Sequence, residues 1–559
     1  MLIDERINQI VPVLSPAQMK FALRFASGPS KRFAPNETML DVGDRDTIVW
    51  LVIEGSLIAS RRDGLGRGGF FASGGPGQFS GEVSDLAGHA SLAKICAGPE
   101  GCVAYPFDLP HLRALLIGSS DIGEMMIRAF ILRRAAFLEG DSVGSVILGD
   151  ATSQDTVRLR GLLTRNSYPH SLIDADGIEG KNLIERLGVH EDELPILICP
   201  NGSLLRRPSD AEAGVGLGIT PMMEPGMLVD VLIVGAGPAG LATAVYAASE
   251  GLSVLVVDSR SFGGQAGASA RIENYLGFPT GISGQALTAR AFIQAQKFGA
   301  RFAVPVSVVG IDFSTPALHR VSLDNGITVT ARSVVIASGA RYRRPEIVNL
   351  DRFDGTSVSY WATPIEAAIC EGRDIILVGG GNSAGQAAVF LSAHARKVHL
   401  VVRAAGLEAS MSRYLIERIA ATSNVELHSH TSVSGLLGTA EGALEHVLLS
   451  SKLTGETSQI DAQHMFLFTG AEPNNQWLSG QVALDPKGFV ITGQSPHRTL
   501  ETSTPGVFAV GDVRSGSTKR VAAGVGEGAA TVSQIHAYLA ELDSRASEAL
   551  APLKPLQAH

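Results

Sequence analysis

The chain has 559 residues, of which 45% are hydrophobic and 18% charged, and it contains 63 glycines. This length is enough for roughly three or four domains, and the composition fits a glycine-rich α/β protein. The formal net charge of −9 argues against nucleic acid as a partner. We expect no membrane span and no signal peptide, because no long apolar run occurs and the N-terminus is mixed and acidic. Four cysteines without a C-x-x-C favour a cytoplasmic protein.

Residues 1–140 begin with one helical stretch and continue as short apolar segments broken by Gly, Pro and Asp. Such segments predict a small β-roll, and apolar residues at three- and four-residue spacing predict the helices that follow. Cys96 and Cys102 flank the segment AGPEG, which we interpret as a hairpin turn. We expect both to be buried free thiols.

The segments IVWLVIEGSLIAS and FSGE, the latter ending at Glu82, give this block a resemblance to cyclic-nucleotide-binding domains. In that family the glutamate binds ribose and an arginine a few residues later pairs with the phosphate. Here Ser91 occupies the arginine position, with Lys94 nearby, and serine cannot form a bidentate phosphate pair. We therefore expect a related domain that either binds no ligand or takes another small ligand near Glu82.

Residues 143–222 alternate strand and helix patterns and end in a β-hairpin with Asn201-Gly202 at its turn. This order resembles a thioredoxin or glutaredoxin fold, and the resemblance makes Pro195 the cis-proline beside the redox site. The C-x-x-C of that family is replaced by residues 152–155, which contain no sulfur. The resemblance implies a docking or spacer module without redox chemistry, with Cys199 in its core.

The most informative segment is MLVDVLIVGAGPAG, a strand pattern that ends in G-x-G-x-x-G at Gly235, Gly237 and Gly240. A helix-compatible run and then SVLVVD follow, ending at Asp258. This is the βαβ context that the motif requires, with an acid about 20 residues on for ribose hydroxyls. It predicts a dinucleotide site at a helix N-terminus.

A second glycine turn occurs in DIILVGGGNSAGQAAVFL, at Gly379, Gly381 and Asn382. Two such motifs in one chain imply two dinucleotides, and FAD with a nicotinamide is the common pair.

Over residues 226–545 the chain resembles thioredoxin reductase and its flavoprotein relatives. The segments that carry the resemblance, besides the two turns, are Gly263-Gly264-Gln265, Glu273-Asn274-Tyr275, VVIASGARYRRP and TSTPGVFAVGDV. It implies an FAD domain at 226–345 and 469–545, an inserted NAD(P) domain at 346–468, a tail at 546–559, and a homodimer. In it Asp512 binds the ribityl chain, and a helix after KRVAAGVGEGAA points its N-terminus at the flavin. The implied cofactor-binding residues are Gly235, Gly237, Pro238, Ala239, Asp258, Ser259, Gly264, Gln265, Asn274, Gly339, Gly511, Asp512, Arg520, Val521 and Ala522 for FAD, and Gly379, Gly381, Asn382, Ser383 and Arg403 for NADP.

The chain departs from this family at the redox-active dithiol. Where thioredoxin reductases read C-A-T-C, this chain has Trp361 and Pro364 at the two cysteine positions. Cys370 lies six residues further on without a partner thiol in sequence. We expect Trp361 either to stack near the flavin ring or to fill a gap between domains. No protein residue is expected to be catalytic, because the flavin carries the chemistry.

The nicotinamide side is altered as well. Arg403 alone remains of the basic cluster that binds the 2′-phosphate, and no acid stands at that strand end. The pattern favours NADPH over NADH. The sequence contains no metal-ligand motif.

Three functions remain open at this stage. The leading one is an FAD-dependent, NAD(P)H-linked oxidoreductase that passes electrons to an external acceptor, such as a ferredoxin-like protein, a thioredoxin-like protein, a quinone or another small molecule. The second is an FAD-holding sensor regulated through the N-terminal domain. The third is a thioredoxin-disulfide reductase that acts through a partner's cysteines.

Overall fold

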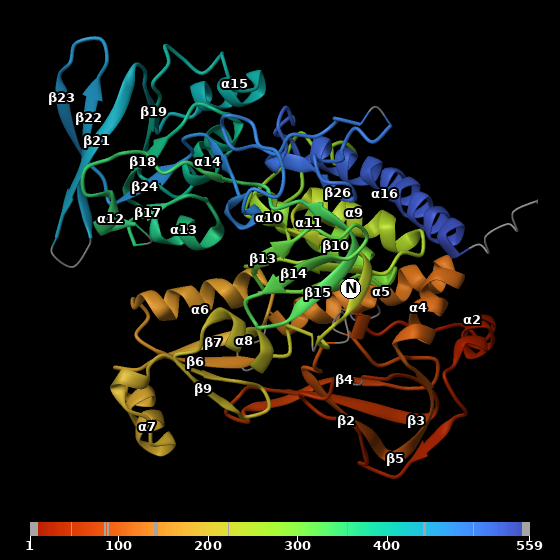
Figure 1. Ribbon diagram of the computed structural model, residues 1–559. Helices are drawn as coiled ribbons and strands as arrows, with labels where there is room; N and C mark the ends of the chain where they lie inside the picture. Colours follow the sequence, from red (N-terminus) through yellow and green to blue (C-terminus); the bar gives the residue numbers. More distant parts are fainter. Residues whose placement is uncertain are drawn as a thin grey trace, which may run out of the picture.

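The computed structural model describes residues 9–45, 47–82, 85–86, 89–138, 144–221, 223–354, 356–439, 443–495 and 497–550. Within these ranges the chain forms four larger sheets, one after another, and two small ones (Figure 1). No helix in the described ranges combines the length and apolar character that crossing a bilayer requires.

The first sheet is antiparallel, with the order β1-β5-β3-β4 and with β2 also paired to β5. Its strands are β1 (Lys31–Phe33), β2 (Thr38–Leu40), β3 (Val49–Arg62), β4 (Gly68–Gly74) and β5 (Ala93–Phe107). Helix α2 (Pro16–Ala22) precedes it, and α4 (Leu109–Gly118) and α5 (Ser120–Leu138) follow. Asp108 starts α4 because its carboxylate accepts the N–H of His111 at 3.0 Å.

The segment AGPEG does not form the predicted hairpin turn. Strand β5 runs through it, and its pairing with β3 jumps from Gly55↔Cys102 to Leu57↔Ala97. The prediction was wrong because Gly101, at φ +82, makes a bulge that bends the strand without reversing it.

The second sheet is mixed, with the order β7-β6-β8-β9. Strands β6 (Ser145–Gly149) and β7 (His170–Asp174) are parallel, whereas β8 (Ile196–Ile198) runs antiparallel to β6 and pairs with β9 (Leu204–Arg206). Helices α6 (Gln154–Arg165), α7 (Ile178–Leu187) and α8 (Asp210–Gly216) complete this part. The peptide bond before Pro195 is cis and Gly202 has φ +85 in the β8–β9 turn, so the predicted cis-proline and hairpin are confirmed.

The third sheet has the order β12-β11-β10-β15-β14-β13, with β26 paired to β15. Its strands are β10 (Leu228–Val234), β11 (Val254–Val257), β12 (Arg301–Ala303), β13 (Val308–Asp312), β14 (His319–Leu323), β15 (Thr328–Ile336) and β26 (Val507–Ala509). Its helices are α9 (Pro238–Ser249), α10 (Gly264–Gly267), α11 (Gly284–Lys297) and α16 (Val521–Leu550). The central strands are parallel and buried on both faces, which explains their continuous apolar sequences.

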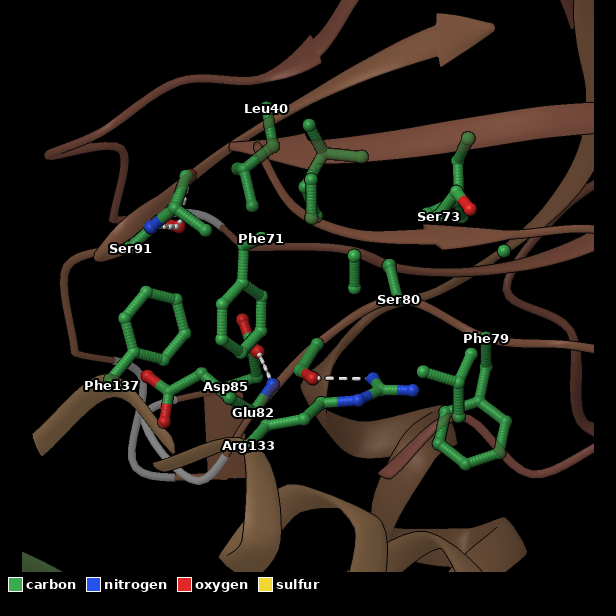
Figure 2. A pocket seen from close by; sticks show the side chains of 18 residues that line it. Leu40, Phe71, Ser73, Phe79, Ser80, Glu82, Asp85, Ser91, Arg133 and Phe137 are labelled. Atoms are coloured by element: carbon green, nitrogen blue, oxygen red, sulfur yellow. Dashed lines mark hydrogen bonds between the residues drawn. The ribbon is translucent and has the colours of Figure 1, made fainter. Parts of the chain in front are cut away.

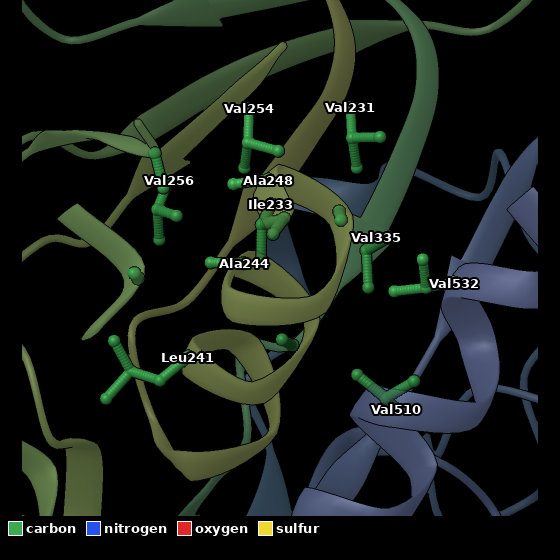
Figure 3. Packing of buried hydrophobic residues seen from close by; sticks show 14 of the residues in the cluster. Val231, Ile233, Leu241, Ala244, Ala248, Val254, Val256, Val335, Val510 and Val532 are labelled. Carbon is green, nitrogen blue, oxygen red and sulfur yellow. The ribbon is translucent and has the colours of Figure 1, made fainter. Parts of the chain in front are cut away.

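Helix α9 packs closely on this third sheet. Figure 3 shows Val231 and Ile233 of β10 against the small side chains Ala244 and Ala248 of α9, with Val532 of α16 alongside. Small side chains let the helix axis approach the sheet, which brings the helix N-terminus to the carboxyl ends of the strands.

The fourth sheet is parallel, with the order β17-β24-β18-β19-β20. Its strands are β17 (Val358–Ser359), β18 (Asp374–Val378), β19 (Lys397–Val401), β20 (Val425–His428) and β24 (His464–Leu467), and its helices are α12 (Leu350–Phe353), α13 (Pro364–Ile369), α14 (Asn382–Leu391) and α15 (Arg413–Ala421). A three-stranded sheet of β21 (Thr431–Gly438), β22 (Leu444–Ser451) and β23 (Thr457–Asp461) packs on one face. Strands β16 (Ala340–Tyr342) and β25 (Ala471–Pro473) pair where the chain enters and leaves this unit.

The first two units pack against the third. Ile293 of α11 is buried in the same hydrophobic cluster as the residues of the first sheet. Asn166, after α6, donates its side-chain N–H to the carbonyl of Arg260 at 3.0 Å, and the Thr220 hydroxyl donates to the carbonyl of Val304 at 2.8 Å. These contacts fix the N-terminal part against the nucleotide-binding part.

Candidate functional site

The first glycine turn joins β10 to α9. Gly235 has φ +112, and a Cβ there would lie 2.3 Å from the carbonyl oxygen of Ala337. A Cβ on Gly240 would lie 1.9 Å from the carbonyl oxygen of Gly235. Gly237 is the N-cap of α9, and a Cβ there would meet nothing closer than 3.9 Å. The fold itself requires the outer two glycines, whereas Gly237 leaves open space before a helix N-terminus, where a phosphate binds well.

Asp258 stands at the end of β11, as the motif predicts. One carboxylate oxygen accepts the N–H of Ala236 at 2.9 Å, and the other accepts the N–H groups of Arg260 at 2.9 Å and Ser261 at 3.2 Å. Burial raises the pKa of Asp258. The side chain therefore holds the glycine turn in shape, and the oxygen that accepts from Ala236 keeps a lone pair for a ribose hydroxyl.

The segment with Gly263, Gly264 and Gln265 lies directly against the glycine turn. Gly263 and Gly264 have φ +99 and +54, and a Cβ on Gly264 would lie 3.0 Å from the Cα of Gly237. The Gln265 side chain donates to the carbonyl of Ala340. Gly237, Asp258 and Gly264, which are up to about 30 positions apart in the sequence, thus lie around one open space.

Gly511 and Asp512 reach the same place from the far end of the chain. The N–H of Gly511 donates to Glu527 at 2.6 Å, and a Cβ on Gly511 would lie 2.9 Å from the Cβ of Ala239. Burial raises the pKa of Asp512, while the nearby Lys519 lowers it. The buried carboxylate is suited to accept hydroxyl hydrogen bonds from a bound polyol chain.

Helix α16 starts at Val521, so KRVAAGVGEGAA does not precede the helix but forms its first turns. The predicted start of this helix was wrong because glycine has a low helix propensity, so the glycine-rich segment was not expected to be helical. Here they permit contact with α9: a Cβ on Gly528 would lie 2.3 Å from the carbonyl oxygen of Ala239. Arg520 directly precedes the helix, and Val521 and Ala522 are its first two residues.

The second glycine turn joins β18 to α14. Gly379 has φ +146, and a Cβ there would lie 2.6 Å from the carbonyl oxygen of Phe468. Gly381 is the N-cap of α14, and a Cβ there would meet nothing within 4 Å. The Asn382 side chain accepts the N–H of Ser412 at 2.7 Å, which fixes the turn to the loop before α15. Both turns thus begin with a glycine at positive φ that has no room for a Cβ, and both have a glycine with open space around it as the helix N-cap.

Several predicted site residues are exposed to solvent. Those that are exposed are Ser259, Gly264, Gln265, Asn274, Ser383, Arg403, Arg520 and Ala522. Gly339 has φ +66, with no atom within 4 Å of a Cβ built there. Exposure suits side chains that would contact a ligand across an open cleft.

Two contacts that the sequence did not reveal join the two nucleotide units. The Tyr342 hydroxyl hydrogen-bonds to Ser383, and burial raises the Tyr342 pKa. Arg418 of α15 pairs with Glu273 at 2.6 Å. Since Asp512 also acts on the Tyr342 pKa, this tyrosine lies between the two sites.

The positions of the missing dithiol are held by a local hydrogen-bond network. The Trp361 indole N–H donates to Glu366 at 2.9 Å, and the backbone N–H of Thr363 donates to the same carboxylate at 2.9 Å. Pro364 is the first residue of α13. Burial lowers the pKa of Arg165, at the end of α6, and the charge of Glu366 counteracts this.

No described thiol replaces the dithiol. All four cysteines are free. Burial raises the pKa of Cys370 to about 12 and also raises the pKa values of Cys199 and Cys102. Thiols with raised pKa values are poor nucleophiles at neutral pH. Cys96 is half-buried, with its sulfur 3.8 Å from the Thr38 hydroxyl.

The first unit contains a separate cavity of about 50 Å³, lined largely by apolar residues (Figure 2). Glu82 projects into it, and neither carboxylate oxygen has a hydrogen-bond partner among the described residues. Arg134 lies 3.7 Å from one of these oxygens. Ser91 also lines the cavity, and its hydroxyl donates to the carbonyl of Ala93 at 2.9 Å.

Sequence reasoning missed the buried cation of this cavity. Arg133 of α5 is 7% exposed and donates to the carbonyl of Gly81 at 2.7 Å. Burial lowers the Arg133 pKa to about 10, and Asp85 and Glu82 counteract this. Arg133 lies 51 residues after Glu82 in the sequence, on a helix whose apolar spacing is typical of core packing. No local pattern therefore indicated that it lines the same cavity as Glu82.

The geometry of the third and fourth units defines a class of protein. Each unit has a bare glycine turn at a helix N-terminus, and Asp258, Gly264 and Asp512 converge on the first. These residues fit FAD in the first site and a nicotinamide dinucleotide in the second. The class is an oxidoreductase with two dinucleotides.

Comparison with known proteins identifies the family. The model of the pyridine nucleotide-disulphide oxidoreductase family matches residues 229–528, and the chain belongs to this family. Within it the chain is a thioredoxin reductase-like, FAD-dependent NAD(P)H oxidoreductase, and the cofactors of this group are FAD and NADPH. The match begins at residue 229, so the first two sheets lie outside it.

The relatives cover only the C-terminal part of this chain. Thioredoxin reductase of Mycolicibacterium smegmatis is 34% identical over 320 residues, 56% of this chain and 97% of that protein. NADPH-dependent thioredoxin reductase 3 of Arabidopsis thaliana is 32% identical over 325 residues; the chain spans only 59% of that protein. The crystal structure of Lactococcus lactis thioredoxin reductase in its FR conformation is 26% identical, with a TM-score of 0.53, and covers 56% of this chain and 99% of that one.

Proposed function

We propose that this enzyme passes electrons from NADPH through FAD directly to an external acceptor, without an internal dithiol. When bound, FAD accepts a hydride and releases electrons singly or in pairs. The observation that carries the proposal is the Trp361–Glu366 hydrogen bond, which anchors an aromatic side chain at a position that the family resemblance gives to a cysteine. Neither Trp361 nor Pro364 can carry thiol exchange.

The assignment of individual residues belongs to the same proposal. The FAD site comprises the residues around Gly237, Asp258 and Asp512, and the NADPH site comprises those around Gly381, with Arg403 for the 2′-phosphate. The absence of an acid at the end of β19 supports NADPH over NADH. No side chain is assigned a catalytic role.

The cysteines provide the first test. We expect a variant with serine or alanine at Cys199 and Cys370 to keep the wild-type rate of flavin reduction by NADPH, because both thiols are buried and have raised pKa values. The measurement is stopped-flow absorbance of the flavin, with Cys96→Ser as a control for thiol removal elsewhere. A rate of flavin reduction by NADPH, or of flavin reoxidation by the acceptor, that falls tenfold in the Cys199 and Cys370 variant but not in Cys96→Ser would contradict an electron path without thiols.

The acceptor is an external redox protein of ferredoxin-like or thioredoxin-like type, a quinone or another small oxidant. The names of the relatives favour a thioredoxin as the partner, which would then supply its own cysteines at the flavin. Steady-state NADPH oxidation with each acceptor in turn separates these cases. From the family resemblance we also expect a cytoplasmic homodimer.

We assign the first two units, at 1–140 and 143–222, as a cyclic-nucleotide-binding-like domain and a thioredoxin-like domain without cysteines. The strand order β7-β6-β8-β9 and the cis bond before Pro195 support the second assignment. The hydrogen bonds of Asn166 with Arg260 and of Thr220 with Val304 connect this unit to the third unit. They favour a second candidate function, in which the N-terminal part senses a ligand and regulates the flavoprotein.

The cavity at Glu82 is the ligand site in that second function. The buried Glu82 carboxylate has no hydrogen-bond donor among the described residues, and its ion pair with Arg134 is long at 3.7 Å, so a small ligand with donor groups would stabilise it. The discriminating measurement is turnover: a sensor binds its ligand at this cavity but shows no sustained reduction of any acceptor.

The buried acid beside this cavity makes the stability of the protein depend on pH. Burial and the neighbouring Glu82 raise the pKa of Asp85 to about 6. The stability gained by its protonation is complete below about pH 4 and is lost as the pH rises through 6. We therefore expect Asp85→Asn to stabilise the protein above pH 6, by up to about 3 kcal/mol, and to flatten the profile below it. Thermal unfolding between pH 4 and 8 measures this; a variant that is less stable than wild type at pH 8 would refute it.

A further inference from the structure

A cluster of metal-ligating side chains lies on the fourth sheet, outside both nucleotide sites. Strands β19 and β20 are parallel, and their register pairs His399 with Glu426. His428 follows Glu426 by two residues. Because side chains alternate along a strand, all three lie on the same face of the sheet.

The three donor atoms form a compact triangle. His399 Nδ1 lies 3.0 Å from His428 Nε2, and 3.9 Å from Glu426 Oε2. His428 Nε2 lies 3.6 Å from Glu426 Oε1. Zinc bonds of 2.0–2.1 Å in a tetrahedral arrangement put neighbouring donor atoms about 3.4 Å apart. The triangle therefore has the size of one zinc site.

The protonation states suit a metal. Burial lowers the pKa of both His399 and His428, which favours their neutral form. A neutral imidazole offers one nitrogen lone pair, and two imidazoles with a carboxylate form a common donor set for zinc. The ring proton now shared between the two nitrogens moves to the other nitrogen of its ring when a metal binds.

The three side chains of the cluster differ in their exposure to solvent. The His399 side chain is 7% exposed, that of His428 19%, and that of Glu426 47%. The carboxylate thus stands at the opening and the imidazoles lie inside, which leaves a fourth position for water. Lys397 pairs with Glu426 at 2.5 Å and competes with a metal for that carboxylate.

We propose that His399, Glu426 and His428 bind one divalent transition-metal ion, with zinc as the natural probe. The ion would cross-link the edge strand β20 to β19 and stabilise this unit according to RT ln(1 + [metal]/Kd). The site lies in the NADPH-binding unit but shares no residue with the proposed NADPH site.

The test is metal titration of the full-length protein after it has been stripped with a chelator. Zn²⁺ affinity is measured by competition with a chromophoric chelator, and Co²⁺ reports tetrahedral geometry through its visible absorption. We expect one tight site in the wild type and an affinity lower by about 100-fold or more in His428→Gln and Glu426→Gln. His446→Gln is the matched control, because His446 pairs with Asp461 at 2.8 Å in the same unit and belongs to no three-residue cluster among the described residues.

A gain-of-affinity variant sharpens the test. Lys397→Met removes the competing cation, so we expect it to bind Zn²⁺ more tightly than the wild type. The proposal is overturned if the wild type binds no ion, or if His428→Gln and Glu426→Gln bind Co²⁺ with wild-type affinity and spectrum. Equal thermal unfolding of the metal-free proteins shows that the variants fold.

Discussion

Replacing Gly237 by valine is expected to yield a folded protein that does not hold FAD. Gly237 has ordinary extended dihedrals as the N-cap of α9, and a Cβ there lies no closer than 3.9 Å to any other part of the chain. Because valine is a poor N-cap residue, we expect the substitution to lower the free energy of unfolding by about 1 kcal/mol. The valine methyl groups, however, fill the space in front of the helix N-terminus. We expect FAD affinity to fall by at least about 100-fold, or 3 kcal/mol.

The measurement is the ratio of flavin absorbance to protein absorbance after purification, with far-ultraviolet circular dichroism to show folding. Gly235→Val is the contrasting variant, because φ +112 and a 2.3 Å contact make its valine incompatible with the turn. Gly235→Val is expected to lose both FAD and folding. A yellow Gly237→Val protein with full flavin content would show that the FAD site lies elsewhere.

Replacing Gly381 by valine is expected to separate the two cofactors. Gly381 is the N-cap of α14 with nearly the same backbone conformation as Gly237, and nothing lies within 4 Å of a Cβ there. The variant should remain folded and yellow, because its own unit does not hold FAD. NADPH affinity should fall by at least about 100-fold.

Flavin reduction by NADPH under anaerobic conditions measures this second effect, with dithionite as a control that the flavin is still reducible. The expected Gly381→Val protein bleaches with dithionite but not with NADPH at wild-type saturating concentration. Wild-type reduction kinetics in this variant would contradict the assignment of the second glycine turn.

Local features of the third and fourth units could be predicted from the sequence because each depends on a short stretch. The glycine turns at 235–240 and 379–381 follow from φ angles that only glycine adopts easily, and the strands before them are uniformly apolar. The turn at Gly202 follows from the local Asn-Gly signature, whereas the cis bond before Pro195 is implied only by the resemblance to the thioredoxin fold.

Features that depend on distant partners could not be predicted. Arg133 donates to the carbonyl of Gly81, 52 residues earlier in the chain, and Arg418 meets Glu273 across 145 residues. The His399 and Glu426 side chains become neighbours only through the pairing of β19 with β20. The glycines of α16 could not be recognised as helical because their role is contact with α9, which no local sequence pattern shows.

Two features of the N-terminal part connect the proposed regulation to the structure. Ile293 of α11 shares a hydrophobic cluster with the first unit, and the Glu366 carboxylate that holds Trp361 also acts on Arg165 of the second unit. A ligand at Glu82 that shifts the first unit would therefore strain contacts of the flavoprotein itself. The N-terminal part is thus packed directly against the third unit.

The central claim is that FAD receives electrons from NADPH and that no internal dithiol takes them further. Anaerobic titration of the purified holoenzyme with NADPH, followed at the flavin absorbance, tests it most directly. The account predicts complete bleaching after one equivalent of NADPH per FAD, since the flavin is the only two-electron group in the path. Bleaching that requires two equivalents, or none with either NADPH or NADH, would contradict it.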